Sequence, residues 1–135
     1  MITKLIRVTV LVRDQDEALQ FYTEKLGLEK RDDMMFGPGA RWLTVGPKGQ
    51  QDIEIVLQKP EPAMHGEQGA AEMLSHIGQG TTWVFATDDC RADYETLRAR
   101  GVTFQSPPSD QPYGVEAVFE DLYGNSFSLL QPTRS

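Results

Sequence analysis

Apolar and polar residues in the first part of the chain alternate in short runs separated by turn residues, a pattern typical of β-strands. Gly37-Pro38-Gly39 and Gly46-Pro47-Lys48-Gly49 supply two of these turns. The predicted strands are Leu5 to Val12, Leu28 to Phe36, Arg41 to Val45 and Asp52 to Gln58.

A helix is predicted directly after the first strand. Asp14 can cap its N-terminus, and Glu17 stands at the third position of a capping-box pattern. Apolar residues then recur at helical spacing as far as Leu26, and Gly27 suits the left-handed residue that ends a helix. The first part of the chain is therefore predicted to have the order βαβββ.

The same order begins again after residue 80. The predicted helix starts at Asp88 or Asp89 and ends at Gly101, and Pro107-Pro108 and Tyr123-Gly124-Asn125 mark turns. The apolar stripe of this helix consists of Cys90, Tyr94 and Leu97. The predicted strands are Thr81 to Thr87, Val102 to Gln105, Val115 to Glu120 and Ser126 to Gln131.

This order is an internal repeat, because equivalent residues keep a near-constant offset. The offset is 74 or 75 positions for three pairs: Asp14 and Asp89, Gly27 and Gly101, and Glu54 and Ser128. We predict an α+β protein with a single domain over residues 1–135. Two βαβββ modules, 1–58 and 81–131, are related by duplication and flank a connecting segment, 59–80, with a short helix around Ala70 to Ser75.

Neither module can bury both faces of its sheet alone. Two curved mixed sheets that pair leave a cleft between them, in which a small molecule can sit. The sequence leaves open whether the modules pair within one chain or exchange across a dimer.

Composition narrows the set of partners. The chain is an ordinary globular mixture, with 39% hydrophobic and 24% charged residues, and its net charge of −7 repels nucleic acid and anionic membranes. No apolar run is long enough to span a bilayer, and the first residues lack a signal-peptide layout, so we expect a cytoplasmic protein. Cys90 is the only cysteine, which excludes an intrachain disulfide.

Five segments carry a resemblance to a known family. They are Val8 to Asp14, Phe21 to Leu28, Val84 to Asp89, Leu97 to Val102, and Phe119 to Leu129. In this order and spacing the chain resembles the vicinal oxygen chelate superfamily, which includes glyoxalase I, extradiol dioxygenases, and bleomycin and fosfomycin resistance proteins. The resemblance covers nearly the whole chain and implies the glyoxalase/bleomycin-resistance fold. It implies no single reaction, because this fold hosts many.

Metal-dependent members of this family present a ligand from the first and last strand of each half. The resemblance places these positions on Arg7, Glu54, Thr82 and Ser128. An arginine has no lone pair to donate, and neutral hydroxyls are poor ligands for divalent transition metals. We therefore expect no divalent metal and no other cofactor. His65 and His76 lie in the connecting segment, where we expect surface or structural roles.

Strand alternation predicts further side chains that face the cleft. Trp42 is a candidate, and Met34, Met35 and Phe36 either add to an apolar wall or pack against a partner subunit. Tyr113 resembles a residue of the loop over the cleft mouth, with Glu116 near the same rim. The predicted ligand-binding residues are Arg7, Thr9, Trp42, Glu54, Thr82, Val84, Tyr113 and Ser128.

Two interpretations of Arg7 stay open. Its guanidinium either replaces the metal electrostatically, pairing with Glu54 while Thr82 and Ser128 complete the hydrogen bonding, or forms a purely structural ion pair with Glu54.

Three functions follow. The first is a metal-free protein that, like the antibiotic-resistance branch of the family, binds a small cationic or aromatic molecule as a homodimer. The second is a lyase, isomerase or dioxygenase acting on a small oxygenated substrate, with Glu54 as a candidate base. The third is a regulatory or orphan protein that retains only the fold.

Overall fold

The computed structural model describes residues 1–79 and 83–133. The chain divides into two compact units, Met1–Ile77 and Gly78–Ser135, and each is described by itself. Each unit holds one four-stranded mixed sheet with a helix between its first and second strands. The predicted α+β class and the two βαβββ halves are therefore confirmed.

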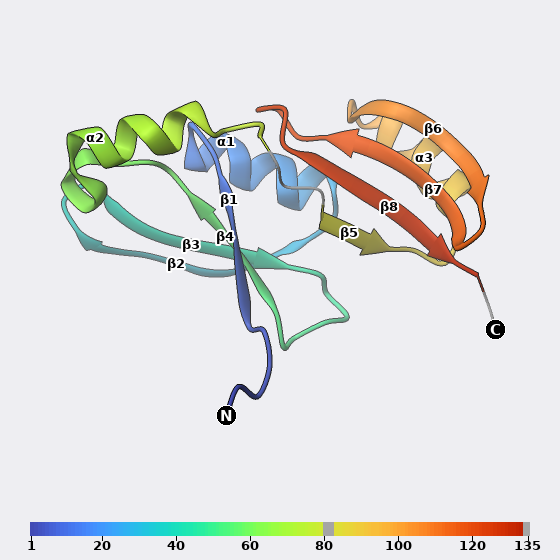
Figure 1. Cartoon of the computed structure of the whole chain (residues 1–135), viewed down its shortest axis with the longest axis horizontal. Helices are drawn as coiled ribbons and strands as arrows, with labels where there is room; N and C mark the ends of the chain where they lie inside the picture. The colour runs from blue at the N-terminus through green and yellow to red at the C-terminus, as the bar shows by residue number, and fades with distance from the viewer. Residues whose placement is uncertain (80–82, 134–135) are drawn as a thin grey trace. The chain divides into compact units, whose positions relative to one another are not determined.

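The first unit contains four strands and three helical segments (Figure 1). Its strand order is β1-β4-β3-β2, and β1 runs parallel to β4 while the other pairs are antiparallel. In chain order the elements are β1 (Arg7–Leu11), α1 (Gln15–Gln20), the π-helical segment η1 (Phe21–Lys25), β2 (Glu29–Gly37), β3 (Ala40–Gly46), β4 (Glu54–Gln58) and α2 (Pro62–Ser75).

The helix after β1 begins where the sequence predicts but does not stay α-helical. Asp14 caps α1, and its side chain accepts a hydrogen bond of 2.9 Å from the Glu17 amide. From Phe21 the helix widens into a π-turn, which adds a residue to the turn. Phe21 and the next residue, Tyr22, are both buried, with their rings 5.4 Å apart edge to face. Apolar spacing alone predicted one continuous α-helix here.

Helix α2 is longer than the short helix predicted around Ala70 to Ser75. Pro62 occupies its first turn, where the missing N–H is no loss, and Gly66 breaks it with a φ of 74°. The predicted connecting segment thus contains a helix that Pro62 starts and Gly66 kinks. His65 has a structural role, since its Nδ1 accepts a hydrogen bond of 3.1 Å from the Glu61 amide.

The second unit repeats the topology of the first, with strand order β5-β8-β7-β6 and β5 parallel to β8. Helix α3 packs against one face of this sheet (Figure 1). Its elements are β5 (Trp83–Ala86), α3 (Cys90–Ala99), β6 (Thr103–Gln111), β7 (Gly114–Glu120) and β8 (Ser126–Pro132). Asp89 caps α3, as one of the two predicted alternatives, and Cys90 is fully buried.

The turn predicted at Pro107-Pro108 was wrong, because both prolines lie inside β6. This strand is at the edge of the sheet and has a register shift between Ser106 and Ser109. An edge strand with an irregular register can hold residues that donate no backbone hydrogen bond.

Strand alternation separates a packed face from an open one in the second unit. The rings of Phe85, Phe119 and Phe127 lie 5.6 to 6.2 Å from one another. Phe104 joins Phe119 to Tyr94 of α3, so this is the face that the helix covers. Residues that alternate with these point to the face without a helix, as the sequence predicts for Val84 and Ser128.

The Asp-x-x-Gly-Asn motif closes the turn between β7 and β8. One carboxylate oxygen of Asp121 accepts hydrogen bonds from the Tyr123 and Asn125 amides, at 2.8 and 2.9 Å. The other accepts one of 2.8 Å from the Asn125 side chain, and Gly124 has a φ of 82°. Asp121 and Asn125 are buried, so this part of the resemblance reports a structural turn.

No helix in the part of the chain that the structure describes is long and apolar enough to cross a membrane.

Candidate functional site

The first unit joins Arg7 and Glu54 in an ion pair. Parallel pairing of β1 with β4 sets the two residues opposite each other, and Nε of Arg7 lies 2.9 Å from Oε2 of Glu54. The Arg7 side chain is 45% exposed and that of Glu54 is 18% exposed. The two positions of this unit that the resemblance assigns to metal ligands are therefore bound to each other.

Two neighbours contact this pair. Thr44, which is buried, donates to Oε1 of Glu54 at 3.3 Å and accepts a hydrogen bond from the Asp32 amide. The Arg7 guanidinium lies 5.6 Å from the centre of the Trp42 ring, within range of a cation–π interaction. We call Arg7, Trp42, Thr44 and Glu54 the Arg7 cluster.

The Arg7 cluster offers a flat surface with one charge pair at its edge. The indole of Trp42 is half-buried, and its Nε1 donates to Asp32 at 3.4 Å, which holds the ring in place. Thr9, one alternation beyond Arg7, is exposed on the same strand. Guanidinium and indole planes both stack on aromatic groups. The cluster can therefore bind a planar aromatic molecule and offer it a hydrogen-bonding edge.

The residues at the metal-ligand positions do not fit a divalent metal. Glu54 is the only carboxylate of the set, and its oxygens already accept hydrogen bonds from Arg7 and Thr44. No three His, Cys, Asp or Glu side chains come together within residues 1–79 and 83–133. Thr82 lies outside the described residues. An arginine, a serine and one engaged carboxylate leave no donor set that a transition metal prefers.

The second unit brings Tyr113 and Ser128 together through Glu116. The Tyr113 hydroxyl donates to Oε1 of Glu116 at 2.6 Å, and the Ser128 hydroxyl donates to its Oε2. Val84 pairs with Ser128 across β5 and β8 and is 57% exposed. We call Tyr113, Glu116 and Ser128 the Glu116 cluster.

Hydrogen bonding controls the ionisation of the Glu116 cluster. Donation by Ser128, and next by Tyr113, lowers the pKa of Glu116, against a smaller opposing effect of burial. The same bond raises the pKa of the Tyr113 hydroxyl. Glu116 is therefore a carboxylate at neutral pH. Among the residues that the structure describes, no Lys or Arg forms an ion pair with it.

The sequence predicts Glu116 near an acidic rim that could hold an aromatic or cationic part of a ligand, but not among the ligand-binding residues. Two signals were available: Tyr113 and Glu116 are three positions apart beside a tight turn, and Glu116 and Ser128 have side chains on one face of neighbouring strands. The second signal depends on the register of β7 against β8. Strand alternation predicts faces but not this register, so the contact was missed.

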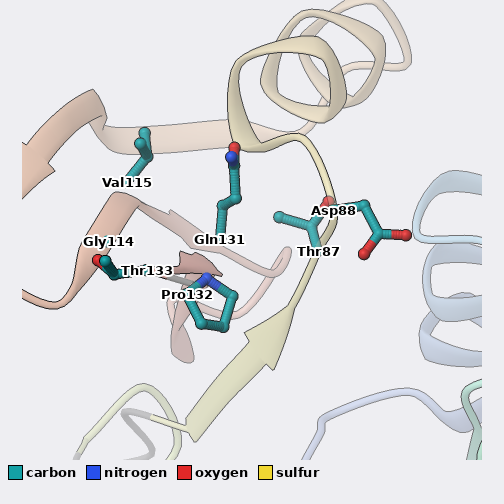
Figure 2. Close-up of a pocket in the computed structure, with 7 residues that line it drawn as sticks. All are labelled: Thr87, Asp88, Gly114, Val115, Gln131, Pro132 and Thr133. Carbon is teal, nitrogen blue, oxygen red and sulfur yellow. The ribbon is translucent and has the colours of Figure 1, made fainter. Parts of the chain in front are cut away.

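Two hollows, one in each unit, lie away from the Arg7 and Glu116 clusters. The one in Figure 2 has a volume of about 420 Å³, and none of the predicted ligand-binding residues that the structure describes lines it. Its lining residues are Thr87, Asp88, Gly114, Val115, Gln131, Pro132 and Thr133. A hollow of about 290 Å³ in the first unit is lined by Asp14, Gln15, Asp16, Met35, Gly39, Arg41, Lys59 and Glu61.

A glutamine that lines each hollow forms a hydrogen bond between a helix start and a strand. In the second unit, Oε1 of Gln131 accepts a bond of 3.0 Å from the Cys90 amide at the start of α3, and the side chain extends towards that helix in Figure 2. In the first unit, Nε2 of Gln15 donates to the Leu57 carbonyl at 2.8 Å. Each glutamine ties the start of a helix to the last strand of its half, so the two hollows occupy equivalent places in the repeat. The chemistry of the predicted residues lies on the sheet faces.

Comparisons with known proteins agree with this fold. The model of the Glyoxalase/Bleomycin resistance protein/Dioxygenase superfamily matches residues 4–129. The crystal structure of UcmS2 is 47% identical, covering 96% of this chain and 98% of that one, with a TM-score of 0.87. That of TnmS3, an antibiotic binding protein from Streptomyces sp. CB03234, is 34% identical, covering 98% of each chain, with a TM-score of 0.79. An uncharacterized protein of Shewanella frigidimarina is 34% identical over 130 residues, 94% of this chain and 92% of that protein.

The substitution Ser128→Ala is expected to raise the pKa of Glu116 towards its ordinary value, because it removes the hydrogen bond that lowers this pKa most. An NMR pH titration of the side-chain carboxyl carbon measures the change. The pKa of Glu116 is lower in the folded protein than in the unfolded chain. Ionised Glu116 therefore stabilises the folded state at pH values above its ordinary pKa, and this contribution is lost as the pH falls through the folded-state pKa. Ser109→Ala, on the exposed end of β6, is the control, and equal midpoints in both variants would contradict the assignment.

Proposed function

Because the chain belongs to the Glyoxalase/Bleomycin resistance protein/Dioxygenase superfamily, we propose that it is a metal-free cytoplasmic protein that binds and sequesters a small antibiotic-like molecule. The observation that carries this proposal is the Arg7–Glu54 ion pair. A permanent cation stands at a position where metal-dependent relatives present a ligand, and it engages the carboxylate that a metal would need.

Binding on the Arg7 cluster rests on stacking and edge contacts. Trp42 and the guanidinium of Arg7 supply a flat surface, and Glu54 keeps that guanidinium oriented at 2.9 Å. An aromatic molecule gains dispersion and cation–π attraction on such a surface without covalent chemistry. The description of TnmS3 as an antibiotic binding protein supports a ligand of this class.

An enzymatic function has less support from the same residues. Arg7 donates to Oε2 of Glu54 and Thr44 donates to Oε1. If Glu54 acted as a base, taking up a proton would remove the negative charge that pairs with Arg7, so the reaction would have to break up this ion pair. A lyase, isomerase or dioxygenase acting on a small oxygenated substrate is therefore the alternative, and we favour binding without turnover.

We also propose that the protein acts as a homodimer. Met34, Met35 and Phe36 are consecutive residues of the edge strand β2, and they are 55%, 63% and 57% exposed. Neighbouring residues of a strand point to opposite faces, so both faces are uncovered at this end within the first unit. A second copy of the chain would bury this apolar end and complete the wall of the binding surface.

Ligand binding and the role of Arg7 can be tested together. A thermal-shift screen of planar aromatic and cationic antibiotics, including bleomycin, together with glutathione adducts and catechols, is expected to show stabilisation by at least one antibiotic. Mass spectrometry after incubation should recover that compound unchanged. Conversion of any compound in the screen by the protein would contradict a sequestering function.

With the antibiotic that binds, Arg7→Ala is expected to weaken affinity by at least about ten-fold, because stacking and orientation are lost together. The free energy of unfolding should fall by less than about 1 kcal/mol, since the pair is partly exposed. Arg91→Ala breaks an exposed ion pair of the second unit and should leave affinity unchanged. If Arg7→Ala changes neither affinity nor stability, the pair is not the centre of a site.

The homodimer is tested by light scattering coupled to size-exclusion chromatography. The expected mass is twice the 15.1 kDa of one chain. Phe36→Glu should shift the protein to the single-chain mass, because it places a charge in the apolar contact, whereas Leu122→Glu, at an exposed apolar residue of the second unit, should not. A wild-type protein that elutes with the mass of one chain at micromolar concentration would overturn the proposal.

A further inference from the structure

Glu116 lies on the open face of the second unit's sheet. Its neighbour on β7, Ala117, is fully buried, and Phe119 contacts the aromatic cluster under α3, so Glu116 points away from that helix. Two neutral hydroxyls hold it, those of Tyr113 and Ser128, which come from the turn before β7 and from β8. The carboxylate is thus fixed in position by groups that leave its charge in place.

The carboxylate also keeps unused hydrogen-bonding capacity. An ionised carboxylate offers about four acceptor sites, and Tyr113 and Ser128 take one on each oxygen. The first unit differs, because its carboxylate at Glu54 is already neutralised by Arg7. A positively charged group on a ligand therefore finds a free counter-charge at Glu116 and none at Glu54.

Apolar and hydroxyl side chains flank Glu116, with Leu130 opposite it on β8 and Ser109 opposite it on β6. Val84, opposite Ser128, is 57% exposed. The Tyr113 side chain is 52% exposed, and its hydroxyl bonded to Glu116 keeps the ring beside the carboxylate. A carboxylate next to an exposed aromatic ring provides the two attractions that bind an organic ammonium group.

We infer that the Glu116 cluster recognises a protonated amine on a small organic molecule, with the ammonium group on the free side of Glu116 and its carbon substituents against Tyr113 and Val84. This inference rests on the proposed function, since it names a chemical group of the molecules that the protein would bind. The net charge of −7 adds long-range attraction for such a cation.

Glu120 provides a matched control on the same strand. It is two alternations further along β7 than Glu116, on the same face, and accepts a hydrogen bond of 3.0 Å from the Gln105 amide. Its bonded partner is an amide side chain, so it lacks the tyrosine ring that stands beside Glu116. A binding effect of general negative charge would appear at both positions, whereas a built ammonium site would appear at Glu116 alone.

The test is an amide NMR titration of the full chain with 2-phenylethylammonium chloride and, separately, with 2-phenylethanol, which has the same ring and no charge. We expect saturable shifts centred on Tyr113, Glu116 and Ser128 with the amine, and affinity at least about ten-fold weaker for the alcohol. Glu116→Gln should weaken amine binding by at least about ten-fold, while Glu120→Gln should change it by less than about two-fold.

Equal affinity for amine and alcohol in the wild-type protein would overturn the inference without the need for any variant. So would the absence of saturable shifts at these residues, or equal losses in the two glutamine variants. A dispersed spectrum of Glu116→Gln shows that it remains folded.

The proposed function fails separately, in the antibiotic screen. If the protein binds the ammonium probe but no antibiotic, sequestration of antibiotics is contradicted. If it binds an antibiotic but shows no preference for the ammonium probe over the alcohol, only the inference about Glu116 is contradicted.

Discussion

The parallel pairing of the first strand with the last strand in each half positions everything else that the protein presents on its sheets. The helix after the first strand carries the chain across the sheet to the far edge strand, and the next two strands fold back, each antiparallel to the one before it. The last strand therefore lies beside the first, β4 beside β1 and β8 beside β5, although they are distant in sequence. This pairing places Arg7 opposite Glu54 and Val84 opposite Ser128. The caps at Asp14 and Asp89 begin the helices that make the crossovers possible.

The two halves use the same topology for different electrostatics. In the first, the last-strand carboxylate of Glu54 is neutralised by Arg7 and backed by the Trp42 ring. In the second, Ser128 on β8 takes the place of Glu54 and donates a hydrogen bond to Glu116 on the neighbouring strand β7. The Glu116 carboxylate stays ionised at neutral pH. The repeated scaffold thus carries a carboxylate paired with a cation in one half and a carboxylate held by two neutral hydroxyls in the other.

Features that depend on local sequence were predictable. The repeat offset predicted both halves, the cap residues predicted where the helices begin, and the register implied by the family resemblance brought Arg7 to Glu54, which the structure pairs at 2.9 Å. Features that depend on tertiary context were not. The prolines of β6 are tolerated because that strand is an edge, and the π-turn lies where two consecutive aromatic residues, Phe21 and Tyr22, are both buried. Glu116 was underrated because its contact with Ser128 follows from the register of β7 and β8.

We propose that Arg7 stands where a metal-dependent relative holds a ligand, so that this surface binds organic molecules in place of a metal. Elemental analysis by mass spectrometry of the purified protein, after incubation with Zn²⁺, Mn²⁺, Fe²⁺ and Ni²⁺ in turn and removal of free ions, tests this directly. We expect far less than one metal ion per chain for each of the four, because an arginine and an engaged carboxylate offer no adequate donor set. One tightly held ion per chain, lost on substitution of Glu54 by glutamine, would contradict it.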